Sequence, residues 1–241
     1  MILKVGSANN SIVKQDEVLP VKSESEKTNF EFDEKNRKSI NISAFSDLSK
    51  DHFNFLLNHA FNKKANDALA GHLKTSYYYN DWPKDFEEYL INKVINDDDL
   101  MNEAKEKKLI KDDPSLFLNV LWINKQKKHE FNPIHFHTGV FSFIIPMQIP
   151  YDLNEEDRNL HGGSESGFYT SRLSFVACKN NDLEVQTMNV DQSYVGKVLM
   201  FSSSLNHQVY PFFTSDDERI TVSGNILRRD WEHNYGSGSS S

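Results

Sequence analysis

The chain has 241 residues, enough for one large domain, and its 38% hydrophobic and 12% aromatic content is typical of a folded globular protein. A formal charge of −8 argues against a protein whose whole surface binds DNA or anionic lipid, so a nucleic-acid partner is disfavoured. The single cysteine, Cys178, excludes an intramolecular disulfide, and we expect a cytoplasmic protein because the sequence lacks a secretion signal and a membrane-spanning apolar run.

The first part of the chain changes from a polar stretch to a helical pattern. Residues 22–41 are charged and poor in aliphatic side chains, so we expect residues 1–45 to form an N-terminal extension that is partly flexible. From residue 46 apolar side chains recur at intervals of three and four, which predicts a helix with Ser46 or Ser49 as its N-cap.

A second helix is expected to begin near Trp82-Pro83, because proline is favoured at the first helical position. The acidic run Asp97-Asp98-Asp99 interrupts its pattern, and a short third helix is possible over residues 100–107. We therefore assign residues 46–115 to supporting helices of the same domain.

The period of the sequence changes after Pro114. Residues 116–123 have the composition of a strand, and strand-like runs separated by turns continue to Arg228, with no further helix expected. Helices that precede a run of strands predict an α+β domain in which the helices cover one face of a mostly antiparallel sheet. The strand-rich core is expected to span residues 116–235, and the Gly/Ser-rich residues 236–241 are expected to be an artificial linker.

A pair of histidines, His135 and His137, stands at the start of an apolar run. Residues two apart on a strand project to the same face, so both imidazoles can bind one metal ion. The apolar run over residues 140–146 predicts a buried strand directly after the pair. The alternative is a pair of structural histidines without a ligand.

His207 is the third candidate ligand. Gly196 is expected to form a tight turn and residues 198–201 a buried strand, after which a serine-rich bend leads into the strand that carries His207. Such a path is typical of a double-stranded β-helix, or jelly roll, that returns a third ligand to the pair. The alternative is a histidine that caps a turn.

A polar face follows on the last predicted strand. Strict alternation from residue 219 to residue 226 places Arg219, Thr221, Ser223 and Asn225 on one face. A guanidinium can hold both oxygens of a carboxylate and a hydroxyl two residues later can add a donor, so this face suits a carboxylate ligand. The alternative for Arg219 is a surface salt bridge with a neighbouring acidic residue, Asp216 or Glu218.

The order His135-x-His137, His207, Arg219-x-Thr221 resembles the Fe(II)- and 2-oxoglutarate-dependent oxygenase superfamily. Within it, the runs Trp122-Ile123-Asn124, Glu130 to Gly139 and Arg219 to Asn225 are similar to oxygenases encoded by tailed bacteriophages and some bacteria. The resemblance covers residues 116–228 and implies a double-stranded β-helix core buttressed by the N-terminal helices. It also implies the host cytoplasm as the location if the gene belongs to a phage.

The resemblance implies a hydroxylase that uses Fe(II), 2-oxoglutarate and O₂. His135, His137 and His207 would bind the iron, and Arg219, helped by Thr221, would hold the far carboxylate of the cosubstrate. Further candidates for cosubstrate binding are Asn132, Ser223 and Asn225. The 2-oxo acid would be converted to succinate and carbon dioxide while the substrate is hydroxylated.

His137 departs from the family pattern, in which a carboxylate stands two residues after the first histidine. Replacing a carboxylate with an imidazole makes the site one charge unit more positive, and three histidines also suit Zn, Cu or Ni. Two other functions therefore compete: a non-catalytic jelly-roll binding or assembly module, and a cupin-type three-histidine metalloenzyme that needs no 2-oxo acid. Arg219-x-Thr221 favours the oxygenase, because neither alternative requires a guanidinium near the metal.

The polar residues 152–167 are expected to form either a surface loop or a lid over the site. Peptidyl groups, nucleobases and small molecules are all substrates compatible with such a core. We expect specificity to reside in this loop and in the helical half of the chain.

Overall fold

The computed structural model describes residues 40–59, 71–112, 114–158, 169–179 and 181–231, all of which belong to one compact unit. Within these ranges the helices are α1 (Lys50–Asn58), α2 (Lys84–Ile95), α3 (Asp98–Glu106) and α4 (Leu153–Arg158). The strands are β1 (Ile42–Phe45), β2 (Thr75–Tyr78), β3 (Leu116–Gln126), β4 (Asn132–His135), β5 (Phe141–Gln148), β6 (Leu173–Lys179), β7 (Asp182–Met188), β8 (Val198–Ser202), β9 (Asn206–Val209) and β10 (Arg219–Arg228). Two short 3₁₀ turns cover Gln192–Tyr194 and Arg229–Trp231.

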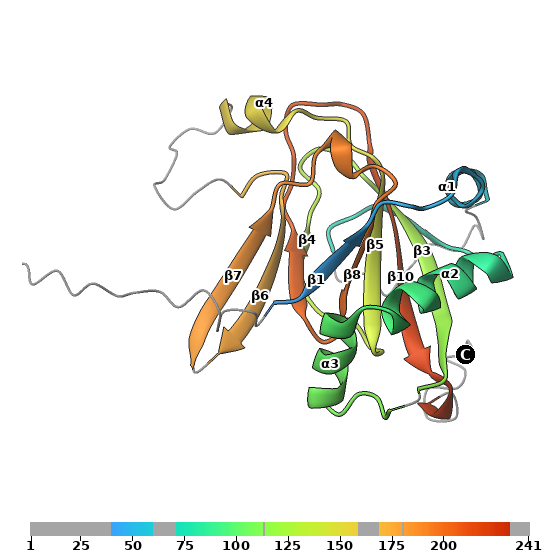
Figure 1. Cartoon of the computed structure of the whole chain (residues 1–241). Helices are drawn as coiled ribbons and strands as arrows, with labels where there is room; N and C mark the ends of the chain where they lie inside the picture. Colours follow the sequence, from blue (N-terminus) through green and yellow to red (C-terminus); the bar gives the residue numbers. More distant parts are fainter. Residues whose placement is uncertain (1–39, 60–70, 113, 159–168, 180, 232–241) are drawn as a thin grey trace, which may run out of the picture. The chain divides into compact units, whose positions relative to one another are not determined.

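The strands form two antiparallel sheets. One sheet has six strands in the order β1-β8-β5-β10-β3-β2, and the other has four in the order β4-β9-β6-β7. In Figure 1 the helices α2 and α3 lie against the larger sheet, and the smaller sheet stands on its other side. This arrangement confirms the predicted α+β class and the jelly-roll core supported by N-terminal helices.

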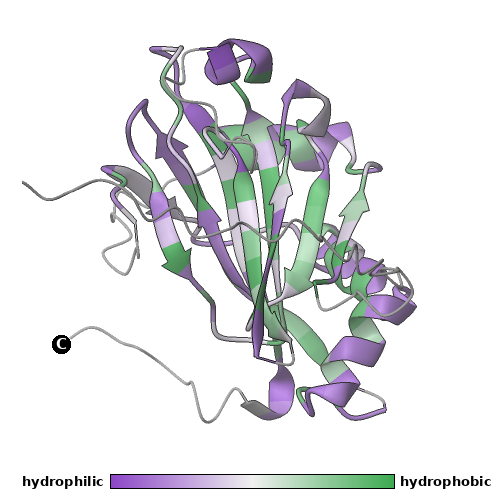
Figure 2. Ribbon diagram, turned by 90° about the vertical axis from the view of Figure 1, so that its left-hand side faces the viewer, coloured by the Kyte–Doolittle hydropathy of each residue, from purple (hydrophilic) through white to green (hydrophobic). Residues whose placement is uncertain are grey.

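Two hydrophobic clusters cover the two faces of the larger sheet, as period-2 alternation requires. On β8, Val198 and Met200 belong to the cluster that contains the buried residues of α1, α2 and α3, whereas Leu199 and Phe201 belong to the cluster shared with the smaller sheet. Figure 2 shows hydrophobic residues concentrated along the central strands. The face toward the smaller sheet is therefore the one that can carry a site between the sheets.

The helices begin largely where the sequence indicates. The side chain of Ser49 accepts a hydrogen bond from the backbone N–H of His52 and caps α1, as expected for one of the two candidate serines. Pro83 is the residue before α2. Asp97 ends the pattern of α2 and caps α3, since its carboxylate accepts from the N–H of Leu100.

One expectation about the second half of the chain is wrong: α4 is a helix inside the region where only strands were predicted. Six residues are too few for a helix to be stable from local propensity. Two backbone N–H groups of its first turn donate to the carboxylate of Asp152. The buried carboxylate of Glu156 accepts hydrogen bonds from Phe213 and Thr214, which belong to a distant loop. Tertiary contacts rather than local sequence thus stabilise α4.

The folded domain does not begin at the predicted boundary. β1 pairs with β8 and lies inside residues 1–45, so the folded domain begins before residue 46. Residues 1–39, which include most of the predicted extension, lie outside the described residues, as do residues 159–168 of the predicted lid and the predicted linker 236–241.

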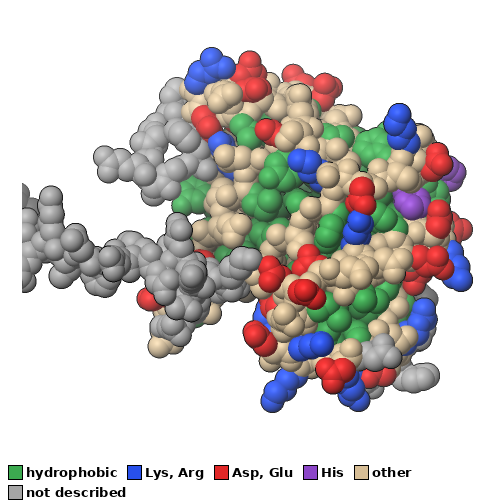
Figure 3. Space-filling model, viewed as in Figure 1, with side chains coloured by type: hydrophobic (Ala, Val, Ile, Leu, Met, Phe, Trp, Pro, Cys, Tyr) green, Lys and Arg blue, Asp and Glu red, His purple; other side chains and the backbone are tan. Residues whose placement is uncertain are grey.

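The surface carries both signs of charge. Figure 3 shows Lys and Arg side chains interspersed with Asp and Glu on the face that it presents. Among the helices of the described ranges, none is long and apolar enough to cross a lipid bilayer.

Candidate metal centre

A cavity of about 390 Å³ lies between the two sheets and contains all the site residues predicted from the sequence. Its walls come from β3, β5, β8 and β10 of the larger sheet and from β4, β6 and β9 of the smaller one. Apolar side chains such as Ile144, Leu173 and Leu199 form part of the lining, and polar side chains from β3, β10 and the histidine-bearing segments form the rest. The cavity therefore combines an apolar lining with a few convergent polar groups, as ligand sites commonly do.

The three predicted histidines lie together in this cavity. Cross-strand register places His135 of β4 opposite His207 of β9, and His137 follows on the same face, fixed by a 2.9 Å hydrogen bond from its N–H to the carbonyl of Ser203. The ring centroids of His135 and His207 are 4.3 Å apart, and that of His137 is 5.0 Å from each. One ligand atom from each ring lies within 4.8 Å of the others, so the three can converge on one ion.

Local hydrogen bonds orient two of the rings. The Nδ1 atom of His135 is 2.7 Å from the carbonyl oxygen of Pro133, and Nδ1 of His207 is 3.1 Å from that of Leu205. A carbonyl can only accept, so Nδ1 carries the proton in both rings. Each Nε2 then keeps its lone pair for a metal, and the carbonyl fixes the ring orientation.

Burial keeps the cluster neutral. It lowers the pKa of His135, and together with the neighbouring charge of His135 it lowers the pKa of His137 to about 4. Burial, followed by the charges of His135 and His137, lowers the pKa of His207 to about 3. Neutral imidazole is the form that binds metals, so at neutral pH the cluster is ready to coordinate.

This donor set fits a divalent transition metal. Three imidazole nitrogens suit Fe, Zn, Cu or Ni, and three protein ligands leave coordination positions for other molecules. Among the described residues the cluster contains no carboxylate. The site thus has three neutral ligands where the resembled pattern has two histidines and one anion.

The guanidinium of Arg219 is buried in the same cavity, and its side chain is only 4% exposed. All five of its N–H groups donate to neutral oxygens of the protein. Nε and Nη2 both donate to Oε1 of Gln126, Nη1 donates to the Tyr151 hydroxyl and to the carbonyl of Ser171, and Nη2 also donates to the carbonyl of Tyr210. The alternative of a surface salt bridge is therefore wrong, and Asp216 pairs with Lys128 instead.

Arg219 has no counter-ion within the described part of the chain, where no carboxylate lies at salt-bridge distance. Buried charges in proteins are normally paired, because removing an ion from water costs several kcal/mol. A buried cation that faces a cavity without an anion is therefore a candidate binding group for an anionic ligand.

The remaining residues of the predicted polar face also line the cavity. Thr221, Ser223 and Asn225 point to it from β10, and the amide oxygen of Asn225 accepts a 2.8 Å hydrogen bond from Ser142. Asn132 of β4 lines the cavity as well, and its Oδ1 is a buried acceptor without a partner among the described residues.

Several residues around Arg219 were not predicted from the sequence. Gln126 and Asn124 of β3 lie opposite Arg219 and Thr221 in the sheet register, and the buried Oδ1 of Asn124 lacks a partner among the described residues. Alternation along β3 from Trp122 could have shown that both face the cavity, but the pairing of β3 with β10 was not predicted. Tyr151 carried no sequence signal of its role.

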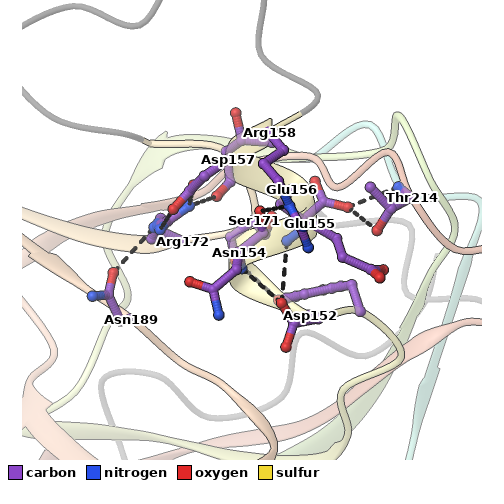
Figure 4. Close-up of polar contacts among 12 residues, drawn as sticks. Asp152, Asn154, Glu155, Glu156, Asp157, Arg158, Ser171, Arg172, Asn189 and Thr214 are labelled. Atoms are coloured by element: carbon purple, nitrogen blue, oxygen red, sulfur yellow. Dashed lines mark hydrogen bonds and ion pairs between the residues drawn. The ribbon is translucent and has the colours of Figure 1, made fainter.

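Contacts of α4 fix the segments that hold Arg219 (Figure 4). The carboxylate of Glu156 accepts from the N–H groups of Phe213 and Thr214 and from the Thr214 hydroxyl. Asp157 forms a bidentate ion pair with Arg172, the neighbour of Ser171. The two loops near Arg219, one containing Arg172 and the other containing Phe213 and Thr214, therefore both form hydrogen bonds with α4.

Comparisons with known proteins bear on this site. Residues 120–225 match the family described as "Putative 2OG-Fe(II) oxygenase", and the search of curated proteins finds no match. A solved Burkholderia pseudomallei oxidoreductase of the 2OG-Fe(II) oxygenase family is 16% identical with a TM-score of 0.32. The alignment covers 47% of this chain and 46% of that one, so this chain spans about half of its length.

Two further solved structures are similar over more of the chain. A Pseudomonas putida prolyl-4-hydroxylase is 11% identical with a TM-score of 0.44, over 79% of this chain and 94% of the other. A Trichoplax adhaerens prolyl hydroxylase, in complex with a hypoxia inducible factor oxygen degradation domain peptide fragment, is 9% identical with a TM-score of 0.43, over 81% and 87%.

Proposed function

We propose that the chain is a 2-oxoglutarate-dependent hydroxylase whose iron is held by His135, His137 and His207, and the match of residues 120–225 to the 2OG-Fe(II) oxygenase family supports this proposal. The family is one of dioxygenases that use Fe(II), 2-oxoglutarate and O₂. The observation that carries the proposal is the presence, in one cavity, of three neutral imidazoles and a buried guanidinium that has no counter-ion among the described residues.

The distance between the two polar ends of the cavity suits a small dicarboxylate. His137 packs against Trp122, which is paired with Ser223, while Arg219 is paired with Gln126 four residues along the same two strands. Four residues of strand correspond to about 13 Å. The Arg219 side chain and a bound dicarboxylate can together bridge this span.

In this proposal the chain's residues bind and orient. Arg219 and Thr221 hold the distal carboxylate, and Asn132, Ser223 and Asn225 supply polar contacts along the cavity. The apolar wall around Ile144 and Leu199 excludes water from the reacting groups. Fe(II) held by the three histidines would activate O₂, which is the oxidant for both the substrate and 2-oxoglutarate; 2-oxoglutarate would thereby be converted to succinate and carbon dioxide.

The third histidine changes the charge balance of the centre. With three neutral ligands the metal keeps its full double charge, one unit more than beside a carboxylate. An anionic cosubstrate is then attracted at both ends, by the metal and by Arg219. His137 is thus compatible with the proposed function, and it increases the electrostatic attraction between the metal and an anionic cosubstrate.

The test is an anaerobic titration of metal-free protein, first with Fe(II) and then with 2-oxoglutarate. We expect a visible absorption band that requires both additions and that is lost in Arg219→Ala, while Arg229→Ala, which removes a half-exposed arginine, retains it. Tight iron binding that is indifferent to 2-oxoglutarate would instead favour the cupin-type enzyme or the non-catalytic module.

A further inference from the structure

The side chain of Gln126 occupies the edge of the Arg219 guanidinium that is formed by Nε and Nη2, and it can move away by a change of rotamer. Both atoms donate to Oε1 of Gln126, the Nε bond being 3.1 Å long. This side-on arrangement is one that a carboxylate adopts with arginine, through two parallel hydrogen bonds. In Gln126 a neutral amide oxygen stands at that edge.

The other acceptors of Arg219 are fixed by the fold. The carbonyls of Ser171 and Tyr210 belong to the backbone, and the hydroxyl of Tyr151 is held because it donates to the carbonyl of Ser171 over 3.0 Å. Gln126 is the only one of the four partners that can release Arg219 by a change of side-chain rotamer. It also lines the cavity, so a ligand can reach it.

We propose that the amide of Gln126 stands in for the distal carboxylate of the cosubstrate and is displaced from Arg219 when a dicarboxylic 2-oxo acid binds. Gln126 is thus a positioning residue that sets the affinity for the cosubstrate and the selectivity for its second carboxylate. This inference rests on the proposed function.

The energetics favour the exchange. Gln126 offers Arg219 a neutral acceptor, whereas the incoming carboxylate is an anion that can accept both hydrogen bonds and also supply the counter-ion that the guanidinium lacks among the described residues. On release, Gln126 loses its two bonds from Arg219 and must also adjust the short bond that its amide donates to the carbonyl of Glu130. The wild-type side chain therefore weakens cosubstrate binding without preventing it.

Two substitutions of Gln126 separate this exchange from a merely structural role. Gln126→Glu has nearly the same shape but places a permanent carboxylate against Arg219, so we expect the affinity for 2-oxoglutarate to fall at least tenfold. Gln126→Ala removes the competitor, so we expect unchanged or up to about tenfold tighter binding. Gln186→Glu, on an exposed position of β7, adds the same charge away from the cavity and serves as the control.

The experiment is an anaerobic calorimetric titration of the Fe(II)-loaded proteins with 2-oxoglutarate and with 2-oxovalerate, which has the same chain length but no second carboxylate. We expect Gln126→Glu to weaken binding of 2-oxoglutarate alone, with iron affinity and 2-oxovalerate affinity as in the wild type. Wild-type affinity for 2-oxoglutarate in Gln126→Glu would overturn the inference. So would an equal loss in both Gln126 variants, since that indicates support of Arg219 rather than competition. Failure of the wild-type protein to bind 2-oxoglutarate would overturn the proposed function itself.

Discussion

Acidification of the metal-free protein should reveal how strongly the histidine cluster resists protonation. The pKa of His137 is lowered to about 4, mainly by burial and further by the charge of His135, whereas an unfolded histidine has a pKa of about 6.5. Between pH 4 and pH 6.5, His137 binds a proton in the unfolded chain but remains largely neutral in the folded protein. The contribution to stability is therefore complete above about pH 6.5 and is lost as the pH falls toward 4.

The magnitude follows from the two pKa values. For His137 alone, the linkage relation gives a loss of about 3 kcal/mol in the free energy of unfolding between pH 7 and pH 4. Carboxylates also titrate in this range, so the informative quantity is a difference between two proteins. His137→Gln cannot take up the proton, and its loss of stability should be about 3 kcal/mol smaller than that of the wild type.

Urea unfolding curves of the metal-free proteins at pH 7 and pH 4 measure this difference. His59→Gln, which changes an exposed histidine, provides the control and should follow the wild type. An equal loss of stability in His137→Gln and the wild type would refute the reasoning, because the folded protein would then accept the proton on His137 at no cost.

Three further predictions concern the ligand set and the fold. His137→Asp restores the carboxylate of the family pattern and should preserve or raise iron-dependent conversion of 2-oxoglutarate to succinate; a fall as large as that in His137→Ala would argue against coordination at this position. Glu156→Ala removes a buried acceptor of three hydrogen bonds and should lower the free energy of unfolding in urea by about 3 kcal/mol, whereas the exposed Glu155→Ala should change it by less than about 0.5 kcal/mol. Gly224→Ala would place a methyl group 2.6 Å from the ring of Phe143 and should destabilise the protein by about 1–3 kcal/mol, measured as a lower thermal midpoint.

The sequence by itself determined features that depend on local geometry. Alternation along one strand required Arg219, Thr221, Ser223 and Asn225 to share a face, and all four line the cavity. The shared face of these four residues was confirmed because the direction of successive side chains is fixed by the strand conformation and not by the partner strand. His135 and His137 also face one point, although His137 lies beyond the end of β4 and is fixed by its hydrogen bond to the carbonyl of Ser203.

Features that depend on which strands pair were decided only by the tertiary structure. The pairing of β4 with β9 places His135 opposite His207, and the pairing of β3 with β10 places Gln126 against Arg219. The helix α4 forms where only strands were expected, because a loop more than fifty residues later donates its hydrogen bonds to Glu156. Such contacts join distant segments, and a local pattern carries no information about the register in which those segments meet.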